Sequence, residues 1–232
     1  MKSKFLIILL ILNIPFSNCK KEKYRPEGVP QDASYEKKRN LYTQIKDGKR
    51  KIWTKEGDFY SECLIDELGR EHGECKNFFP GSGKLITIGN NIHGERDGVW
   101  YWYFPNGNIY YKLTLAHDKK RPVWIETNLL GNEHGAYERY YEDGSLEEKG
   151  SYDTGYKTDY WEKFYKDGQL EYTGYYKKDK KIKDWKYYFS DGKLEVEENF
   201  TGDGKLISRK TYFPDGNLNC EVIPAESKLD CK

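Results

Sequence analysis

The residues in this chain that could carry out chemistry are few, and the histidines stand out first. His72 and His134 lie in the matching strings LGREHGE and LGNEHGA, and His93 also precedes a glycine. A Glu-His pair is compatible with acid-base catalysis or with metal binding. However, one histidine per repeated segment, spread along an extended sheet, would not converge on a single ion. We therefore expect these His-Gly pairs to shape turns, and His117 stands alone.

Other familiar catalytic patterns are absent from the sequence. The segment 81–85, GSGKL, resembles part of a phosphate-binding loop, but the full pattern needs a glycine where Phe78 stands and Ser or Thr where Leu85 stands. No H-E-x-x-H, G-x-S-x-G or EF-hand pattern occurs. Several glutamates could pair as in a glycosidase, but their recurrence is better explained as solubilising charge on the polar face of a sheet: Glu147, Glu148, Glu195, Glu197 and Glu198. We expect a non-enzymatic protein with no metal and no cofactor.

The N-terminus resembles an export signal. Two lysines precede the unbroken apolar run 5–12, which is too short to span a bilayer. The segment ends at Cys19, as in a bacterial lipobox, in which the cysteine is lipidated; Phe16 and Asn18 depart from its commonest residues. We expect residues 1–18 to be a signal peptide and Cys19 to carry the lipid, palmitate included. An ordinary signal peptide cut at another position is the alternative.

A lipid on Cys19 predicts a protein of the bacterial cell envelope, held at the membrane by its N-terminus. Lys20 takes the place of the Asp that retains many lipoproteins at the inner membrane, which favours the outer membrane. Residues 19–50 are polar and rich in Gly and Pro near their start, so we expect a tether or linker there. A short helix over residues 33–45 is also compatible with the spacing of Leu41 and Ile45.

The remaining cysteines indicate disulfides. An even number of cysteines in an exported chain favours bridges, and four allow three pairings: Cys63, Cys75, Cys220 and Cys231. The first two lie six residues on either side of Gly69, which would place them opposite each other across a hairpin. The last two would tie the C-terminal tail to the last strand. Each bridge would stabilise the fold by about 2–3 kcal/mol; free thiols are the alternative.

Turn signals recur along most of the chain with a fixed spacing. Asp-Gly and Asn-Gly between apolar segments are strong hairpin signals, and the turn glycines are Gly83, Gly107, Gly144, Gly168, Gly192 and Gly216. By subtraction the steps are 24, 37, 24, 24 and 24 residues, so one step contains a 13-residue insertion near residues 118–130. Each unit is therefore expected to form a β-hairpin.

The large side chains keep the same period. Seven residues before the turn glycine come Trp100, Tyr137, Trp161 and Trp185; four before it come Tyr103, Tyr140, Phe164, Tyr188 and Tyr212; two after it come Ile109, Leu146, Leu170, Leu194 and Leu218. Beyond the turn, Leu170 and Tyr172 are expected to point one way and Thr173 the other. This alternation predicts a sheet with one wet face.

This unit, seen in residues 161–170 as WEKFYKDGQL, resembles the MORN repeat. It is most similar to the bacterial variant found in the YwqK-type antitoxin-like proteins. The resemblance covers roughly Gly73 to Cys220, with departures at Lys76 and Arg209, where the aromatic residue is missing. It implies an all-β, elongated meander of hairpins that serves as a scaffold with lipid or protein contacts. We expect residues 51–223 to form this domain, flat or rolled, between a disordered N-terminal segment and a tail at 224–232.

These features together predict a protein-interaction scaffold whose partner is unknown. Aromatic residues make up 16% of the chain, so rows of rings on the sheet are the expected binding face: Trp100, Trp102, Tyr137, Trp161, Tyr165, Trp185, Tyr187 and Phe189. The same rings could instead bind cell-wall glycan, or simply seal the sheet. A formal charge of +1 argues against nucleic acid. If the chain is not exported, an antitoxin-like, toxin-neutralising role is the alternative.

Overall fold

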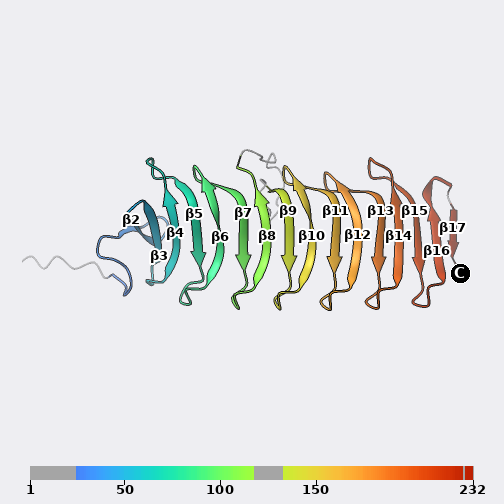
Figure 1. The fold of residues 1–232 in the computed structure, drawn as a ribbon, viewed down its shortest axis with the longest axis horizontal. Helices are drawn as coiled ribbons and strands as arrows, with labels where there is room; N and C mark the ends of the chain where they lie inside the picture. The colour runs from blue at the N-terminus through green and yellow to red at the C-terminus, as the bar shows by residue number, and fades with distance from the viewer. Residues whose placement is uncertain (1–24, 118–132, 227, 232) are drawn as a thin grey trace, which may run out of the picture.

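The computed structural model describes residues 25–117, 133–226 and 228–231, which form one antiparallel β-sheet (Figure 1). Its strands follow the order of the chain, and each pairs with the next. They are β1 (Ser34–Glu36), β2 (Leu41–Lys46), β3 (Lys49–Thr54), β4 (Phe59–Ile65), β5 (Glu71–Phe78), β6 (Leu85–Ile92), β7 (Glu95–Tyr103), β8 (Ile109–Leu115), β9 (Glu133–Tyr140), β10 (Leu146–Asp153), β11 (Tyr156–Phe164), β12 (Leu170–Lys177), β13 (Lys180–Tyr188), β14 (Leu194–Phe200), β15 (Leu206–Tyr212), β16 (Leu218–Ile223) and β17 (Lys228–Cys231). Among the described residues the one helical element is the 3₁₀ turn η1 (Pro224–Glu226).

The sheet is long, narrow and open. Figure 1 shows successive strands side by side along the long axis, with β2 near one end and β17 at the other. At about 4.8 Å per strand, seventeen strands extend over about 75 Å. The predicted all-β elongated meander is thus confirmed, in its open form. None of the helices among the described residues is long and apolar enough to cross a membrane.

The sheet begins earlier in the chain than the sequence indicated. β1 and β2 lie inside the predicted tether, and the short helix considered for residues 33–45 is wrong because Leu41–Lys46 pairs along its length with β3. Here β-branched and aromatic residues in strand pairing outweigh the helical spacing of two apolar residues. The predicted signal peptide, Cys19 and the insertion near residues 118–130 lie outside the described residues.

The Asp-Gly turns at the lower end of Figure 1 share one geometry. In each, the glycine N–H donates to the carbonyl three residues earlier, as from Gly168 to Tyr165 at 2.9 Å, and the glycine has a positive φ, 86° at Gly168. The preceding aspartate, here Asp167, accepts a hydrogen bond on Oδ1 from the N–H of Gln169 at 3.0 Å. These are type I turns followed by a left-handed glycine, which explains why Asp and Gly recur together.

A β-bulge follows each of these turns and changes which residues share a face. Lys163 pairs with Tyr172 and Phe164 pairs with Leu170, so Glu171 is the extra residue. Because Lys163 and Phe164 are neighbours and point to opposite faces, their partners do so as well. The prediction that Leu170 and Tyr172 share a face is therefore wrong, since period-two alternation does not hold across a bulge.

The two faces of the sheet differ in character. The first, which we call the tryptophan face, carries the buried side chains Trp100, Trp161 and Trp185, which are at most 1% exposed. On the opposite face, which we call the ladder face, charged residues such as Lys149 and Glu162 pair across strands. The core of the molecule thus lies on the tryptophan face.

The rings of Trp100, Trp161 and Trp185 each lie over a glycine of the preceding strand. A Cβ atom added to Gly174 would lie 2.1–2.6 Å from the ring of Trp185, and Gly150 meets Trp161 in the same way. The indole N–H is satisfied as well, since Trp185 Nε1 donates to the carbonyl of Tyr175 at 3.1 Å. A residue without a side chain therefore makes room for the largest one, which gives a single layer its dense core.

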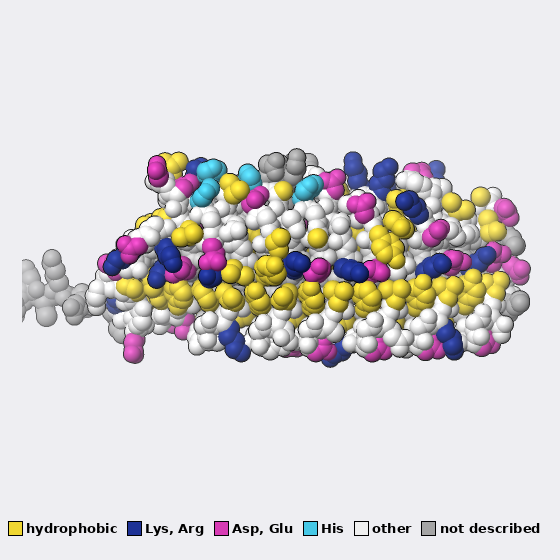
Figure 2. All heavy atoms as spheres, viewed as in Figure 1, with side chains coloured by type: hydrophobic (Ala, Val, Ile, Leu, Met, Phe, Trp, Pro, Cys, Tyr) yellow, Lys and Arg dark blue, Asp and Glu magenta, His cyan; other side chains and the backbone are white. Residues whose placement is uncertain are grey.

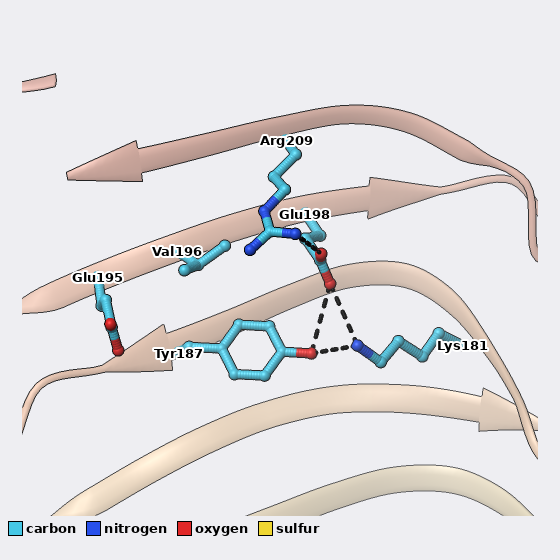
Figure 3. Close-up of a pocket in the computed structure, with 6 residues that line it drawn as sticks. All are labelled: Lys181, Tyr187, Glu195, Val196, Glu198 and Arg209. Carbon is cyan, nitrogen blue, oxygen red and sulfur yellow. Dashed lines mark hydrogen bonds and ion pairs between the residues drawn. The ribbon is translucent and has the colours of Figure 1, made fainter. Parts of the chain in front are cut away.

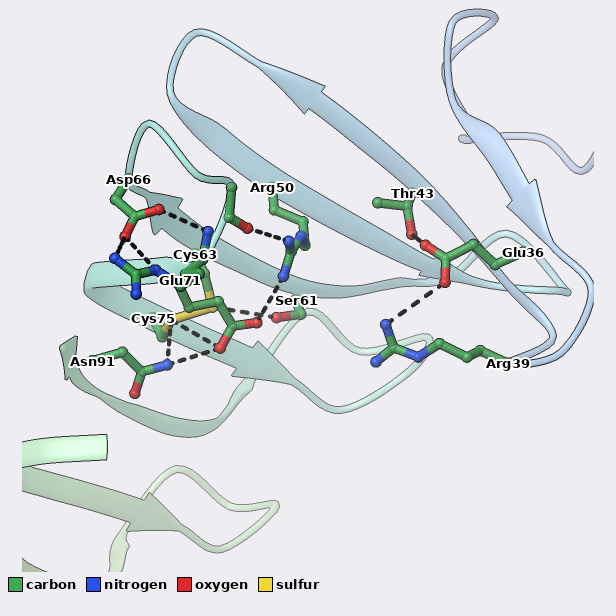
Figure 4. Close-up of polar contacts among 12 residues, drawn as sticks. Glu36, Arg39, Thr43, Arg50, Ser61, Cys63, Asp66, Glu71, Cys75 and Asn91 are labelled. Atoms are coloured by element: carbon green, nitrogen blue, oxygen red, sulfur yellow. Dashed lines mark hydrogen bonds and ion pairs between the residues drawn. A yellow bond between two sulfur atoms is a disulfide. The ribbon is translucent and has the colours of Figure 1, made fainter. Parts of the chain in front are cut away.

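The structure brings both predicted cysteine pairs together. Cys63 lies opposite Cys75 between β4 and β5, with Cα atoms 4.1 Å apart, and Cys220 lies opposite Cys231 between β16 and β17, with Cα atoms 4.0 Å apart. Figure 4 shows the first pair joined beside Glu71. Oxidation of these thiols in the protein stays a prediction, and Cys75 is the more deeply buried member of its pair.

Candidate binding surface

A continuous nonpolar stripe runs along the ladder face, just above the Asp-Gly turns, and is visible as the yellow band in Figure 2. It consists of cross-strand pairs in which an aromatic residue ends the strand before the turn and an aliphatic residue begins the strand after it. All are half-buried: Phe78 and Leu85, Tyr103 and Ile109, Tyr140 and Leu146, Phe164 and Leu170, Tyr188 and Leu194, Tyr212 and Leu218. A contiguous apolar surface of this kind on a soluble fold usually marks a contact with another molecule.

A row of paired charges borders the stripe, and we call it the charge ladder. Its members pair across neighbouring strands and alternate in sign over much of the sheet, with interruptions at Ile88 and Tyr101 and at Thr173: Lys51, Glu62, Lys76, Lys112, Glu138, Lys149, Glu162, Lys186, Glu197, Lys210 and Glu221. Lys149 Nζ lies 2.7 Å from Glu162 Oε2, and Lys112 Nζ lies 3.3 Å from Glu138 Oε2. The charges neutralise one another, so the ladder keeps the face soluble without attracting a partner of one charge sign.

The stripe contains none of the aromatic residues predicted to form the binding face. Trp100, Trp161 and Trp185 are buried, and Trp102 and Tyr137 pack against them on the tryptophan face. These rings are thus core, and three of them present no surface to a ligand. The sequence analysis identified these repeat positions but did not predict that they form a stripe. The aromatic residue before the turn and the aliphatic residue after it lie opposite each other only because of the bulge.

The other predicted aromatics also have structural contacts. Tyr187 lies on the tryptophan face, its ring centroid 6.1 Å from that of Trp185. Tyr165 lies at the turn and donates its hydroxyl to the carbonyl of Tyr188 at 2.7 Å, linking one hairpin to the next. Phe189 lies in the following turn, where its N–H donates to the carbonyl of Lys193 at 2.8 Å.

Cations cover the tryptophan rings at regular intervals. Arg96 lies 4.4 Å from the ring of Trp100, Lys157 lies 3.8 Å from Trp161 and Lys181 lies 4.7 Å from Trp185. Each cation precedes its tryptophan by four residues on the same strand. Burial lowers the pKa of Lys157, although the nearby carboxylate of Glu148 opposes that shift. The side chains of these cations close the core from outside while their charges interact with the rings.

An open hollow of about 300 Å³ lies at the C-terminal end of this row, and Figure 3 shows its lining. Glu198, 8% exposed, is at its centre, with Lys181 Nζ 3.2 Å and Arg209 Nη1 3.7 Å from its carboxylate. The Tyr187 hydroxyl donates to Glu198 at 3.3 Å, and burial together with this carboxylate raises the pKa of Tyr187. These groups satisfy one another, so the arrangement supports the sheet.

Two of the glutamates predicted to be solubilising charge are instead buried on the tryptophan face. Glu148 is 6% exposed, accepts a hydrogen bond from the Tyr172 hydroxyl at 2.6 Å and lies 3.2 Å from Lys157 Nζ. Glu198 has the equivalent position, beside Lys181 and the Tyr187 hydroxyl. The bulge turns them inward, where the cations that cover the tryptophans compensate their charge. Glu197, by contrast, lies in the charge ladder as expected.

The sequence predicted that the histidines lie far from one another along the sheet, and for two of them this is wrong. His93 and Gly94 do form a turn, between β6 and β7. However, His72 is the second residue of β5, which pairs with β6, and the rings of His72 and His93 lie 5.0 Å apart. His117 Nδ1 lies 2.7 Å from Asp97, and His134 Nδ1 lies 3.2 Å from Asp153. Histidine side chains gather along the upper edge in Figure 2.

The hairpins in the middle of the sheet can be compared with known repeats. Residues 96–117, 133–154, 160–178 and 183–201 match the MORN repeat variant. These four segments are similar to MORN repeats. They coincide with the hairpins β7–β8, β9–β10, β11–β12 and β13–β14. The matches span less of the chain than the resemblance seen in the sequence, and the hairpins on either side carry Lys76 and Arg209 in place of the buried aromatic residue. MORN repeats indicate a repeat protein involved in binding.

The other comparisons are distant. No curated protein matches the chain. Among solved structures, a mutant of TarM from S. aureus, in complex with fondaparinux, alpha-GlcNAc-glycerol and UDP, aligns with 50% of this chain and 22% of its own, at 9% identity and a TM-score of 0.30. The GtfA/B complex bound to UDP and GlcNAc aligns with 52% of this chain and 24% of its own, at 13% identity and a TM-score of 0.19. The chain thus spans less than a quarter of these proteins, and the likeness is too low to bear on its function.

Proposed function

We propose that this chain is a non-enzymatic scaffold that binds another protein along the nonpolar stripe. The observation that carries the proposal is the stripe itself, which continues through the MORN-type hairpins on the face opposite the core. Cations cover the three tryptophan rings. Lys149 lies 5.7 Å from the Phe164 ring of the stripe, but no strand or helix of the described residues packs over the stripe. The neutral charge ladder favours a partner that binds through shape and apolar contact rather than through charge.

The proposal places this scaffold in the bacterial cell envelope, with a lipid on Cys19 and the outer membrane favoured over the inner. It is supported by the basic and apolar segment that ends at Cys19. The test is the intact mass of protein extracted from membranes, beside a Cys19→Ala variant. A mass that fits residues 19–232 plus acyl chains, lost in the variant, is expected. An uncleaved chain without acyl groups would contradict the anchor and favour the antitoxin-like role.

Cell-wall glycan is the second candidate ligand, and one pair of rings favours it. Tyr160 is 42% exposed and its ring lies 5.0 Å from that of Tyr175 on the ladder face, where a sugar could stack. Sedimentation of the purified chain with isolated cell walls separates the two proposals. Binding that is lost in a Tyr160→Ala variant would support glycan recognition, whereas a chain that stays in the supernatant supports the protein scaffold.

A further inference from the structure

Three side chains with metal-binding atoms converge at the upper edge of the sheet, away from the stripe. Asp66 lies in the turn between β4 and β5, His72 is the second residue of β5, and His93 lies in the turn between β6 and β7. Their carboxylate oxygen and imidazole nitrogens all lie within 4.8 Å of one another. His93 Nδ1 lies 3.4 Å from Asp66 Oδ2, and the His93 N–H donates to His72 Nδ1 at 3.5 Å.

These separations fit a shared ion. Ligand atoms that lie 2.0–2.1 Å from a tetrahedral zinc ion are about 3.3 Å from each other. The distance from His93 Nδ1 to Asp66 Oδ2, 3.4 Å, already has this value, and the His72 ring is exposed, so its side chain has room to rotate toward an ion. Two imidazoles and a carboxylate suit zinc and related transition metals, whereas calcium and magnesium prefer sets of oxygen atoms.

The backbone orients the carboxylate toward the histidines. Asp66 Oδ1 accepts hydrogen bonds from the N–H groups of Leu68, at 3.0 Å, and Arg70, at 2.9 Å, whereas Oδ2 lies 3.4 Å from His93 Nδ1. These backbone hydrogen bonds hold the carboxylate in place, as the outer partners of a metal ligand usually do.

Arg70 now fills the space between the ligands. Its Nη2 atom lies 2.8 Å from Asp66 Oδ2 and 2.9 Å from His93 Nδ1. The side chain is 44% exposed, so it can turn out to solvent when another cation arrives. A cation of the protein itself therefore competes for the position that an ion would take.

We propose that Asp66, His72 and His93 bind one divalent transition-metal ion, of which zinc is the probe. The protein supplies two nitrogen ligands and one oxygen ligand, and the remaining coordination position faces solvent, open to water or to a donor group of another molecule. This inference is independent of the proposed function.

Calorimetric titration of the metal-free, non-reduced full chain with zinc chloride tests the proposal. We expect one zinc per chain, and His72→Ala and His93→Ala should each lower the affinity by at least about tenfold, a loss that even outer partners of a metal ligand cause. Arg70→Gln should bind more tightly because the competing cation is gone. His134→Ala is the matched control, since His134 has Asp153 beside it at 3.2 Å and should leave zinc binding unchanged.

The outcomes are distinct. No zinc uptake by either the natural chain or the Arg70→Gln variant would overturn the proposal, as would equal affinities of the His72→Ala, His93→Ala and His134→Ala variants. Circular dichroism of each variant shows whether the protein still folds, so that loss of a zinc-binding side chain can be told from loss of the fold. The Asp66→Asn variant repeats the test without altering the turn, because asparagine keeps the Oδ1 acceptor but lacks the oxygen that would bind the ion.

Discussion

Tryptophan and glycine form matched pairs in this sheet. Where the tryptophan is replaced by another residue, the residue at the glycine position is replaced as well. Trp161 lies over Gly150 and Trp185 over Gly174. One period later the tryptophan position is Arg209, and the glycine position is Glu198, 3.7 Å from it. A small residue is needed only beneath an indole ring, so a charged pair replaces both members together. Arg209, which departs from the repeat in the sequence, is thus explained by its neighbour.

A methyl group beneath the ring tests this packing. Gly174→Ala would place a Cβ atom 2.1–2.6 Å from Trp185, so we expect a loss of stability of about 3 kcal/mol, at the upper end of overpacking. Gly202→Ala is the control, because no atom lies within 4 Å of its added Cβ. Thermal unfolding measures both. Equal midpoints for the two variants would show that the ring moves aside freely.

A double-mutant cycle tests the exchange of the pair. Arg209→Trp alone should destabilise the sheet, because the ring meets Glu198, and Glu198→Gly alone should do so because Lys181 and Arg209 lose their partner. Together they recreate the pair seen at Gly174 and Trp185. We expect the combined loss to be smaller than the sum by about 1–3 kcal/mol, measured by urea unfolding. Strict additivity would contradict the matched-pair account.

The hairpin is the element that sets the period, and its turn aspartate has a defined role. Asp143 accepts hydrogen bonds on Oδ1 from the N–H of Ser145 at 3.0 Å and its hydroxyl at 2.6 Å, and Asp191 and Asp215 repeat the backbone contact. Asn106 takes this place in the hairpin of β7 and β8. Both residue types offer the same acceptor oxygen, which is why either appears before the glycine.

These aspartates make the fold sensitive to acid. Hydrogen bonds from the side chain and backbone of Ser145 lower the pKa of Asp143, and those from Lys193 and Asn217 lower the pKa values of Asp191 and Asp215. A folded-state pKa below the unfolded value gives stability that is present above the unfolded pKa, about 3.9, and is lost as the pH falls through the folded pKa.

The unfolding temperature should therefore fall as the pH drops below about 4. Replacing all three turn residues, as Asp143→Asn, Asp191→Asn and Asp215→Asn, keeps the acceptor but removes the titration. We expect this variant to lose less stability over the same range, followed by thermal unfolding at each pH. An identical fall in both proteins would assign the acid sensitivity to other carboxylates.

The two cysteine pairs belong to the hairpins toward the two ends of the described sheet. If both are oxidised, the non-reduced protein is lighter by two hydrogens per bridge, and reduction should lower its stability by about 2–3 kcal/mol for each. Alkylation followed by mass spectrometry checks the first point, and urea unfolding with and without reductant the second. Four alkylated cysteines before any reduction would show free thiols.

At the scale of the whole molecule, the period of the glycines and aromatics predicted the meander, because each unit contacts mainly its neighbours and repeats one local solution. The sequence could not show which faces Leu170 and Tyr172 occupy, since the bulge at Glu171 breaks the alternation. It also assigned Trp161 and Trp185 to the binding face, because spacing alone does not show that Lys157 and Lys181 cover their rings. The approach of His72 to His93 was missed as well, because it depends on the register between β5 and β6.

Site-specific photo-crosslinking in the native cell tests the central claim, that the stripe binds a protein. Tyr187 and Tyr188 are adjacent, half-buried tyrosines that point to opposite faces, the first to the tryptophan face and the second into the stripe. A benzophenone side chain in place of Tyr188 should yield one discrete protein adduct, and the same group in place of Tyr187 should yield none. An adduct at Tyr187 alone, or none at Tyr188, would contradict the account.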